Sequence, residues 1–307
     1  MARVARNGGR RIAAMIAGAQ KCGTTSLLRY LAQHPSLQGH ATVECAYFAD
    51  DHEYAAGWGR RGLGRYFPPT GPELLVAKNV VLSRDSSYVE RLAQHNPDCL
   101  VILMLRDPVD RAFSSYRRER NAGAVERPFS HIVSVLDDPS HDWYRLFVEP
   151  GHYPRTVERL YDHFPRSQVH ILLLKDLRDD AVAVSQEIFR RLGVDPSFEP
   201  DTATVHNAQR RARSRAYART LLWLRQQRNP LKRVAKTVLP SQAFHRVGHA
   251  LVAANSGVLT EEDMAPEVRT ALGAHYAASN AELQRLLGRD LSHWTGMAGT
   301  ERAAAPL

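Results

Sequence analysis

Short apolar runs alternate along the chain with segments in which apolar side chains recur at helical spacing. The candidate strands lie at residues 12–17, 74–79, 100–105 and 169–174. Helical spacing is found at residues 24–34, 83–94, 108–121, 153–164, 175–193 and 266–287. A continuous apolar run is typical of a parallel strand that is buried on both faces. The alternation therefore predicts an α/β fold with a mainly parallel central sheet and helices on both faces.

The first candidate strand leads directly into a turn that is suited to bind an anion. Gly18 and Gly23 are the flexible points of this turn, and the hydroxyl residues 24–26 begin the following helical segment. The first amides of a helix have no partner inside it, and the helix dipole favours negative charge at that end. Since Lys21 adds a full positive charge, the segment predicts a phosphate-binding loop. The alternative is an ordinary strand–turn–helix corner with an exposed lysine.

The position of the lysine separates this turn from the loop of nucleotide triphosphatases. Their pattern is G-x-x-x-x-G-K-[ST], in which the lysine follows the second glycine. Gly18 and Gly23 have that spacing, but Thr24 stands where the lysine should be, and Lys21 precedes the second glycine. The shift counts against a P-loop kinase that phosphorylates a small metabolite with ATP and magnesium. It does not exclude such an enzyme.

A second strand–helix junction carries side chains that suit a phosphate. The run at residues 100–105 ends at Arg106, and Asp107-Pro108 has the form of a helix N-cap followed by proline at the first helical position. The guanidinium fork matches phosphate oxygens. Ser114 lies about two helical turns beyond the cap and so faces the strand end. Taken alone, the pattern is equally explained by an ordinary strand–turn–helix junction.

The composition fits one globular domain. The chain has 307 residues, of which 44% are hydrophobic and 24% charged, and it contains three scattered cysteines. We expect a single domain at residues 12–294, between a basic segment at 1–11 and a loose tail at 295–307. So few cysteines predict neither a disulfide framework nor a zinc site, and a reducing, cytoplasmic setting is expected. The apolar run after the basic start is too short for a secretory signal or a membrane span.

The net charge of +9 is concentrated in one part of the chain, because residues 202–260 contain many arginines and no acidic residue. Such a block attracts a polyanion, an anionic membrane surface or an anionic nucleotide. No nucleic-acid-binding motif is present, so no nucleic-acid partner is expected. Within the block, residues 217–238 predict an amphipathic helix pair laid on the core. An interfacial membrane helix, with peripheral membrane contact, or an oligomer contact is the alternative.

Both phosphate-type segments resemble motifs of sulfotransferases that use 3′-phosphoadenosine 5′-phosphosulfate (PAPS). Residues 21–27 are similar to the 5′-phosphosulfate loop K-x-G-T-T-x-L of the heparan-sulfate-type and related bacterial branch, and residues 106–116 to the 3′-phosphate segment R-D-P-x-x-R-x-x-S-x-Y. The resemblance extends over roughly residues 12–294. It implies a P-loop-like three-layer sandwich, PAPS as co-substrate, adenosine 3′,5′-bisphosphate (PAP) as product, and no metal. The nucleotide-binding residues that it implies are Lys21, Cys22, Gly23, Thr24, Thr25, Ser26, Arg106 and Ser114.

The resemblance also implies a general base. Residues 43–48 partly match the family segment K-E-x-x-F-F, whose glutamate takes the proton from the acceptor hydroxyl. Glu44 retains that glutamate, whereas Val43 replaces the lysine. His40 and His52 flank Glu44 and are the alternative bases, because a histidine serves as the base in the cytosolic branch of the superfamily. The structural alternative for Glu44 is a solvated loop carboxylate.

Three further basic residues receive roles from the resemblance. Lys21 would neutralise charge that builds on the leaving 5′-phosphate. Lys78 matches the reaction-centre lysine of the family strand G-E-K-[ST]-P, although Ala77 and Asn79 depart from that pattern, and a strand-end lysine facing water is the alternative. Arg213 resembles a basic residue of the lid that closes over the nucleotide in the bacterial branch.

The resulting hypothesis is an enzyme that transfers the sulfuryl group of PAPS in line to a hydroxyl, or an amine, of its acceptor. A carbohydrate or glycan, a glycolipid, and a secondary metabolite all remain open as acceptors. Arginine- and alanine-rich usage is typical of a high-GC bacterium and favours a metabolite or glycolipid over heparan sulfate. The competing functions are the small-metabolite kinase and a non-catalytic protein that binds a polyanion or a membrane. Oligomeric state is not predicted.

Overall fold

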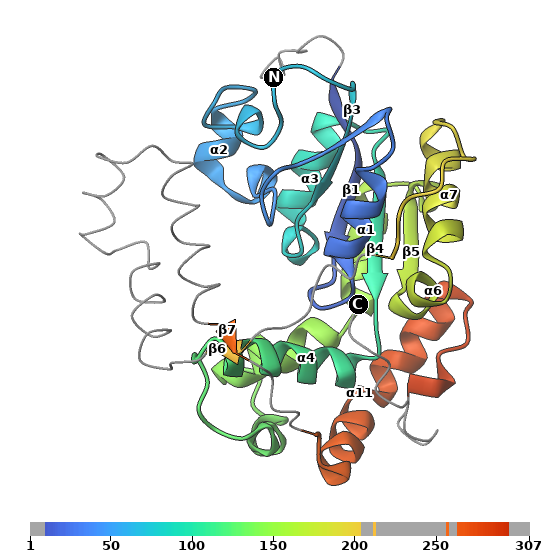
Figure 1. The fold of residues 1–307 in the computed structure, drawn as a ribbon. Coiled ribbons are helices and arrows are strands. Elements are labelled where there is room, and N and C mark those ends of the chain that lie inside the picture. The colour runs from blue at the N-terminus through green and yellow to red at the C-terminus, as the bar shows by residue number, and fades with distance from the viewer. Residues whose placement is uncertain (1–9, 204–210, 213–255, 258–262, 295–307) are drawn as a thin grey trace, which may run out of the picture.

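A five-stranded parallel sheet forms the centre of the molecule (Figure 1). The computed structural model describes residues 10–203, 211–212, 256–257 and 263–294. Neighbouring strands follow the order β2-β3-β1-β4-β5, and every pair in this sheet is parallel. The strands are β1 (Arg11–Gly18), β2 (Leu37–Gly39), β3 (Leu74–Lys78), β4 (Leu100–Leu105) and β5 (Val169–Leu173). A separate antiparallel pair joins β6 (Arg211–Ala212) to β7 (Ser256–Gly257).

Helices cover both faces of the sheet, which confirms the predicted α/β class. They are α1 (Thr24–Leu31), α2 (Asp51–Ala55), α3 (Ser86–His95), α4 (Pro108–Asn121), α5 (Pro154–His163), α6 (Leu174–Asp179), α7 (Ala181–Leu192) and α11 (Pro266–Leu287). The step from β1 to β2 runs across the sheet in the opposite direction from the steps β3 to β4 and β4 to β5. Right-handed crossovers therefore put α1 on one face, and α3 and α5 on the other. Accordingly, α1 packs against α7 and α3 against α5, and Figure 1 shows α3 and α7 on opposite sides of the strands.

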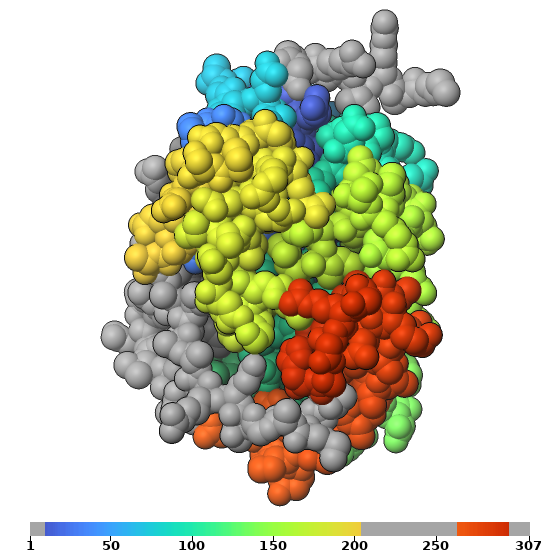
Figure 2. Space-filling view, turned by 90° about the vertical axis from the view of Figure 1, so that its right-hand side faces the viewer, coloured from blue at the N-terminus to red at the C-terminus, as the bar shows by residue number. Residues whose placement is uncertain are grey.

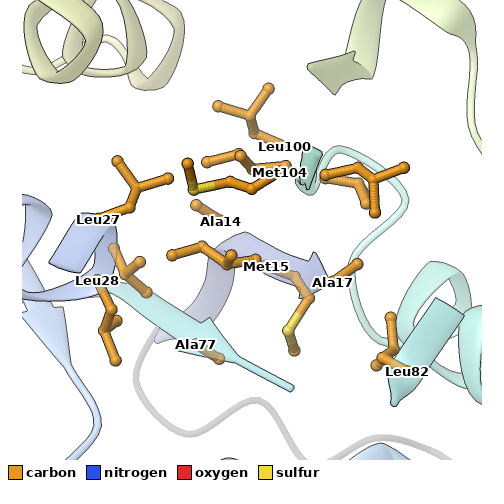
Figure 3. Packing of buried hydrophobic residues seen from close by; sticks show 14 of the residues in the cluster. Ala14, Met15, Ala17, Leu27, Leu28, Ala77, Leu82, Leu100 and Met104 are labelled. Carbon is orange, nitrogen blue, oxygen red and sulfur yellow. The ribbon is translucent and has the colours of Figure 1, made fainter. Parts of the chain in front are cut away.

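The inner strands are buried on both faces, which explains their uninterrupted apolar sequence. Every residue of β4 is buried, and in β1 only Arg11 is exposed. Figure 3 shows Leu27 and Leu28 of α1 on one side of β1 and Leu82 on the other. Each inner strand must therefore present apolar side chains in both directions.

The structure refines several of the predicted boundaries. Residues 175–193 form two helices rather than one, because Asp180 leaves the helical region (φ −153°) and caps α7 by accepting a hydrogen bond from the amide of Ala183. The short strand β2 has no counterpart in the sequence prediction. The predictions for α4 and α11 agree with the structure at both ends. Arg213 and most of the acid-free block at 202–260 lie outside the described residues.

A second, smaller core lies beside the carboxyl end of the sheet. It joins α4 and the start of α11 to two short helical turns, Phe129–Val135 and Tyr144–Val148. Tyr276 of α11 anchors this core, since its hydroxyl donates to the carbonyl of Val148 at 2.7 Å. Figure 2 shows α11 (red) against α5 (yellow-green), and these two helices are in contact. Among the described helices, none combines the length and apolar character needed to cross a membrane.

Candidate active site

The topology has its switch point at the carboxyl end of β1. The connection that follows β1 leaves to one face of the sheet, whereas those that follow its neighbours β3 and β4 leave to the other. Ligands of open α/β sheets bind where connections diverge in this way. The three segments that the sequence singled out begin here, at residues 18–23 after β1, 78–80 at the end of β3 and 106–107 after β4.

The turn after β1 requires glycine for two reasons. Gly23 has φ +80°, and a Cβ there would lie 2.6 Å from Cδ1 of Leu174 on α6. Lys21 is itself left-handed, with φ +69°. Gly23 is the N-cap of α1 without a side-chain cap, and the first turn of that helix contains no acidic residue. The amides of residues 24–26 precede the first intrahelical bond, from the Leu27 amide to the Gly23 carbonyl (3.1 Å), and so remain as donors for an anion.

Three cations gather at this turn. Burial, together with the nearby positive charges of Arg118 and Arg106, lowers the pKa of the Lys21 ammonium to about 8. Holding several like charges together costs free energy unless an anion neutralises them. The electrostatics of the turn therefore fit an anionic ligand.

The junction after β4 is built as the sequence predicts. Asp107 caps α4 by accepting hydrogen bonds from the amides of Val109 (2.8 Å) and Asp110 (3.3 Å), and Pro108 follows at the first helical position. Burial raises the pKa of Asp107 to about 6, and the neighbouring charge of Asp110 adds to this rise. Nη2 of Arg106 lies 3.6 Å from Oδ2 of Asp110, and Ser114 is half-buried on α4.

The structure brings together Glu44 and Lys78, which come from separate segments. Nζ of Lys78 donates to Oε1 of Glu44 at 2.5 Å, and the amide of Val80 donates to Oε2 at 3.1 Å. The Lys78 side chain is only 2% exposed, whereas the Glu44 side chain is 34% exposed. Solvent and an acceptor can therefore reach the carboxylate, while the ammonium lies behind it.

The loop that carries Glu44 is held on both sides by hydrogen bonds that sequence reasoning missed. The amide of Cys45 donates to the carbonyl of Lys78 at 2.8 Å, and the side chain of Asn79 donates to the carbonyl of Cys45 at 2.9 Å. On the other side, the hydroxyl of Tyr66 accepts from the amide of Ala46 at 3.1 Å. These bonds fix the carboxylate relative to the end of β3.

The two alternative bases differ in accessibility. His40 is 7% exposed, and its Nδ1 lies 3.2 Å from Oγ1 of Thr42. Burial, assisted by the charge of Lys78, lowers the pKa of His40 to about 4. His52 is exposed on the short helix α2. The side chain of Glu44 is therefore more exposed to solvent than that of His40.

One buried tyrosine, which no local sequence pattern singles out, connects the two phosphate-type segments. The Tyr153 hydroxyl, just before α5, donates to the carbonyl of Arg106 at 2.9 Å and lies 3.9 Å from Sγ of Cys22. Arg111 of α4 is buried nearby, and its Nη2 donates to the carbonyl of Phe147. Within the described part of the chain, Nε and Nη1 of Arg111 have no hydrogen-bond partner.

Comparisons with known proteins agree on the family to which this chain is similar. Residues 11–232 match the family model described as the sulfotransferase domain. The chain is 28% identical over 212 residues to the human bifunctional heparan sulfate N-deacetylase/N-sulfotransferase 3, a match that covers 64% of this chain and 24% of that protein. It is 25% identical over 212 residues to the Drosophila melanogaster bifunctional heparan sulfate N-deacetylase/N-sulfotransferase, covering 60% of this chain and 20% of that protein. The matched region is thus about a quarter or less of the length of these relatives.

The fold as a whole is similar to that of a solved sulfotransferase structure. The crystal structure of a sulfotransferase from Alicyclobacillus acidocaldarius aligns with a TM-score of 0.64 at 25% sequence identity. The alignment covers 92% of this chain and 98% of that one. The similarity therefore extends beyond the two phosphate-type segments, residues 21–27 and 106–116, to the arrangement of the sheet and its helices.

Proposed function

Because this chain belongs to the sulfotransferase domain family, we propose that it transfers the sulfuryl group of PAPS to the hydroxyl of an acceptor. One observation carries the proposal. A cationic glycine turn at Lys21 and an arginine junction at Arg106 lie at the ends of adjacent strands, next to a carboxylate, Glu44, that reaches solvent. Two anion sites and a base are what the reaction needs.

The nucleotide would be held at its two phosphate groups. Lys21 and the amides of residues 24–26 would bind the 5′-phosphosulfate, and Arg106 with Ser114 would bind the 3′-phosphate. Binding energy at the 3′-phosphate, which takes no part in the chemistry, would hold the reacting group in place. This assignment is consistent with the lowered pKa of Lys21, which burial and then the charges of Arg118 and Arg106 cause, because an adjacent phosphate would stabilise the charged ammonium.

The chemistry follows from the Glu44–Lys78 pair. Glu44 would accept the proton of the acceptor hydroxyl as its oxygen bonds to sulfur. The bond between sulfur and the bridging oxygen of PAPS breaks, and PAP leaves with a negative charge that Lys21 and the turn amides neutralise. Lys78 and the amide of Val80 would each hold one oxygen of Glu44, and a remaining lone pair of the carboxylate would accept the proton.

Two competing functions make different predictions. A small-metabolite kinase would need ATP and magnesium, and the absence of lysine after Gly23 counts against it. A non-catalytic polyanion-binding protein would bind acidic surfaces in a salt-dependent way without turnover. The Glu44–Lys78 pair beside the cationic turn favours an enzyme over the non-catalytic protein, and the position of Lys21 before Gly23 favours a sulfotransferase over the kinase.

The experiment is transfer of ³⁵S from labelled PAPS to a panel of glycans, glycolipids, alkyl glycosides and phenolic alcohols. We expect the wild type to label members of at least one class and Glu44→Gln to label none while still binding PAP. If Glu44→Gln labelled the acceptors as strongly as the wild type, Glu44 would not be the general base. A wild type that binds PAP but labels no acceptor would contradict transfer to these classes.

A further inference from the structure

Two exposed valines are the chain neighbours of Glu44 and of Val80, whose amide binds the Glu44 carboxylate, and we call them the apolar rim. Val43 precedes Glu44 in the chain and is 67% exposed, and Val81 is 37% exposed. Val81 follows Val80, whose amide donates to Oε2 of Glu44 at 3.1 Å. Consecutive Cα atoms are about 3.8 Å apart, so each valine is one residue from a group that forms or holds the proposed base.

The position of these valines matters more than their exposure. Single exposed apolar side chains are ordinary on protein surfaces. In the described part of the chain, however, the exposed large hydrophobic side chains are only Val43, Val81, Val133 and Leu146, and the first two adjoin Glu44 and the residue whose amide binds it. An acceptor has to approach Glu44 from solvent, because the inner side is occupied by Lys78. That approach brings the acceptor past the rim.

We infer that the acceptor is an amphipathic alcohol or glycoside, with an aliphatic portion close to the hydroxyl that receives the sulfuryl group. This inference rests on the proposed function and names its substrate class. Removing a methylene group from water onto an apolar surface improves binding by up to about fourfold. A densely charged polysaccharide would gain nothing from Val43 and Val81.

The test uses three acceptors that share one sugar, namely methyl, butyl and octyl β-D-glucopyranoside below the concentration at which micelles form. With ³⁵S-labelled PAPS, kcat/KM of the wild type should rise at least about tenfold from methyl to octyl. The double variant Val43→Ser/Val81→Ser should reduce that rise to within about twofold without changing PAP affinity. The matched control is Val133→Ser, which removes an exposed valine elsewhere and should keep the full rise.

Three results would overturn the inference. They are equal kcat/KM for the three glucosides, a rise that the rim variant keeps, and a PAP-binding wild type that sulfates none of them. Failure of the proposed function would look different, because the wild type would then not bind PAP at all.

A separate observation concerns Tyr153, which contacts both phosphate-type segments, at Cys22 and at Arg106. Its hydroxyl donates to the carbonyl of Arg106 (2.9 Å) and contacts Sγ of Cys22 (3.9 Å), which belongs to the glycine turn. The side chain is buried, and burial raises the pKa of Tyr153 far above its ordinary value, so the hydroxyl remains a donor at any physiological pH. The strands that lead into these segments are also joined next to them, by a hydrogen bond from the amide of Ala19, just after β1, to the carbonyl of Met104 in β4 at 2.7 Å.

We propose that Tyr153 is a positioning residue that fixes the distance between the two phosphate sites. A ligand with two phosphates gains from both sites only when their separation matches its own. Errors of about half an ångström in such a site are enough to weaken it. A ligand with a single phosphate does not sense the separation. The proposal rests on the proposed function, because it takes PAP as the ligand that spans both sites.

The test compares PAP with adenosine 5′-monophosphate (5′-AMP) in calorimetric titrations of the wild type and Tyr153→Phe. We expect the variant to lose about tenfold in affinity for PAP and less than about threefold for 5′-AMP. Tyr276→Phe is the matched control, since Tyr276 is equally buried and its hydroxyl also donates to a carbonyl, that of Val148. Tyr276 packs against α4 and interacts with Arg111, but among the described contacts it does not connect α4 to the glycine turn, so the variant should leave the ratio of the two affinities unchanged.

Thermal unfolding of both variants separates positioning from a general loss of stability. The proposal fails if Tyr153→Phe leaves the ratio of PAP affinity to 5′-AMP affinity unchanged. It also fails if Tyr276→Phe lowers this ratio by the same factor, because the role of Tyr153 would then be merely structural. A wild type that binds neither nucleotide would instead refute the proposed function.

Discussion

Lys78 and Glu44 form an ion pair in which the cation is buried and the anion reaches solvent, with 2.5 Å between Nζ and Oε1. A buried lysine keeps its charge only if a partner compensates for the lost hydration. The carboxylate in turn has one oxygen on Lys78 and the other on the amide of Val80. The pair therefore orients the proposed base and also supports the end of β3.

Glu44→Gln and Lys78→Met should not act independently. We expect Glu44→Gln to reduce kcat by about 10²- to 10⁴-fold, the usual contribution of general base catalysis, with PAP affinity changed less than about threefold. Lys78→Met should cost nearly as much, and the double variant little more than either single one. The measurement is a double-mutant cycle on kcat, with thermal unfolding as a check on folding. Asp179→Asn, in the exposed Lys175–Asp179 pair, is the control and should be silent. Additive losses would show that the two residues act separately.

Gly23→Ala should damage both stability and nucleotide binding. Its positive φ costs about 1–2 kcal/mol for any residue with a Cβ, and overpacking against Leu174 should add about 1–3 kcal/mol. Gly193→Ala is the matched control, because Gly193 has φ +70° but nothing within 4 Å of a Cβ. Gly193→Ala should lose only the unfolding free energy that corresponds to its positive φ, and it should keep full PAP affinity. Equal changes in unfolding free energy and in PAP affinity for the two variants would contradict this account of the turn.

Arg106→Ala should act selectively on the 3′-phosphate. The lost charged hydrogen bonds are worth about 1.5–3 kcal/mol, or roughly 10- to 150-fold in PAP affinity, whereas 5′-AMP should bind nearly as before. Calorimetry with both nucleotides measures the difference. Arg91→Ala, which removes an arginine paired with Asp51 at 2.6 Å on the surface, should change neither affinity. If Arg106→Ala weakened both nucleotides equally, Arg106 would not be assigned to the 3′-phosphate.

Nucleotide binding should take up a proton near pH 8.5. The pKa of Lys21 is about 8 in the free protein, and an adjacent phosphate should raise it. The complex then holds more protons than the free protein between those two pKa values. PAP affinity is therefore greatest below pH 8 and falls as pH rises through that value, by up to about tenfold per unit.

This pH effect is measured by calorimetry between pH 7.5 and 9.5 in buffers that differ in ionisation enthalpy. Lys21→Arg supplies the control, because arginine keeps its charge throughout this range and should abolish the pH dependence. Binding without proton uptake in the wild type would show that Lys21 does not contact the phosphate.

Local patterns were enough to predict the elements that build the site. The glycine turn, the cap at Asp107 and the helix α4 depend on residues that are close in sequence, and their predicted forms agree with the structure. The strands were recognisable because β1 and β4 are buried on both faces and carry no polar alternation. Which helix covers which face follows from strand order, and strand order is a tertiary property.

The contacts that complete the site could not be read from the sequence. Lys78 and Glu44 were separate candidates, and only the position of β3 beside β1 and the loop bonds at Cys45 bring them together. Tyr153 gave no signal, because its two partners come from distant segments. The second core was also missed, since short turns rather than regular helices supply many of its side chains. Such contacts depend on how elements pack, and no local pattern encodes that.

The most direct test of the central claim is a calorimetric titration of the wild-type protein with PAP, set against ATP with magnesium and against 5′-AMP. Two phosphate sites at one nucleotide predict that PAP binds at least about tenfold more tightly than 5′-AMP, without any metal, and more tightly than ATP with magnesium. Tight binding of ATP with magnesium together with weak binding of PAP would contradict the account and favour a kinase.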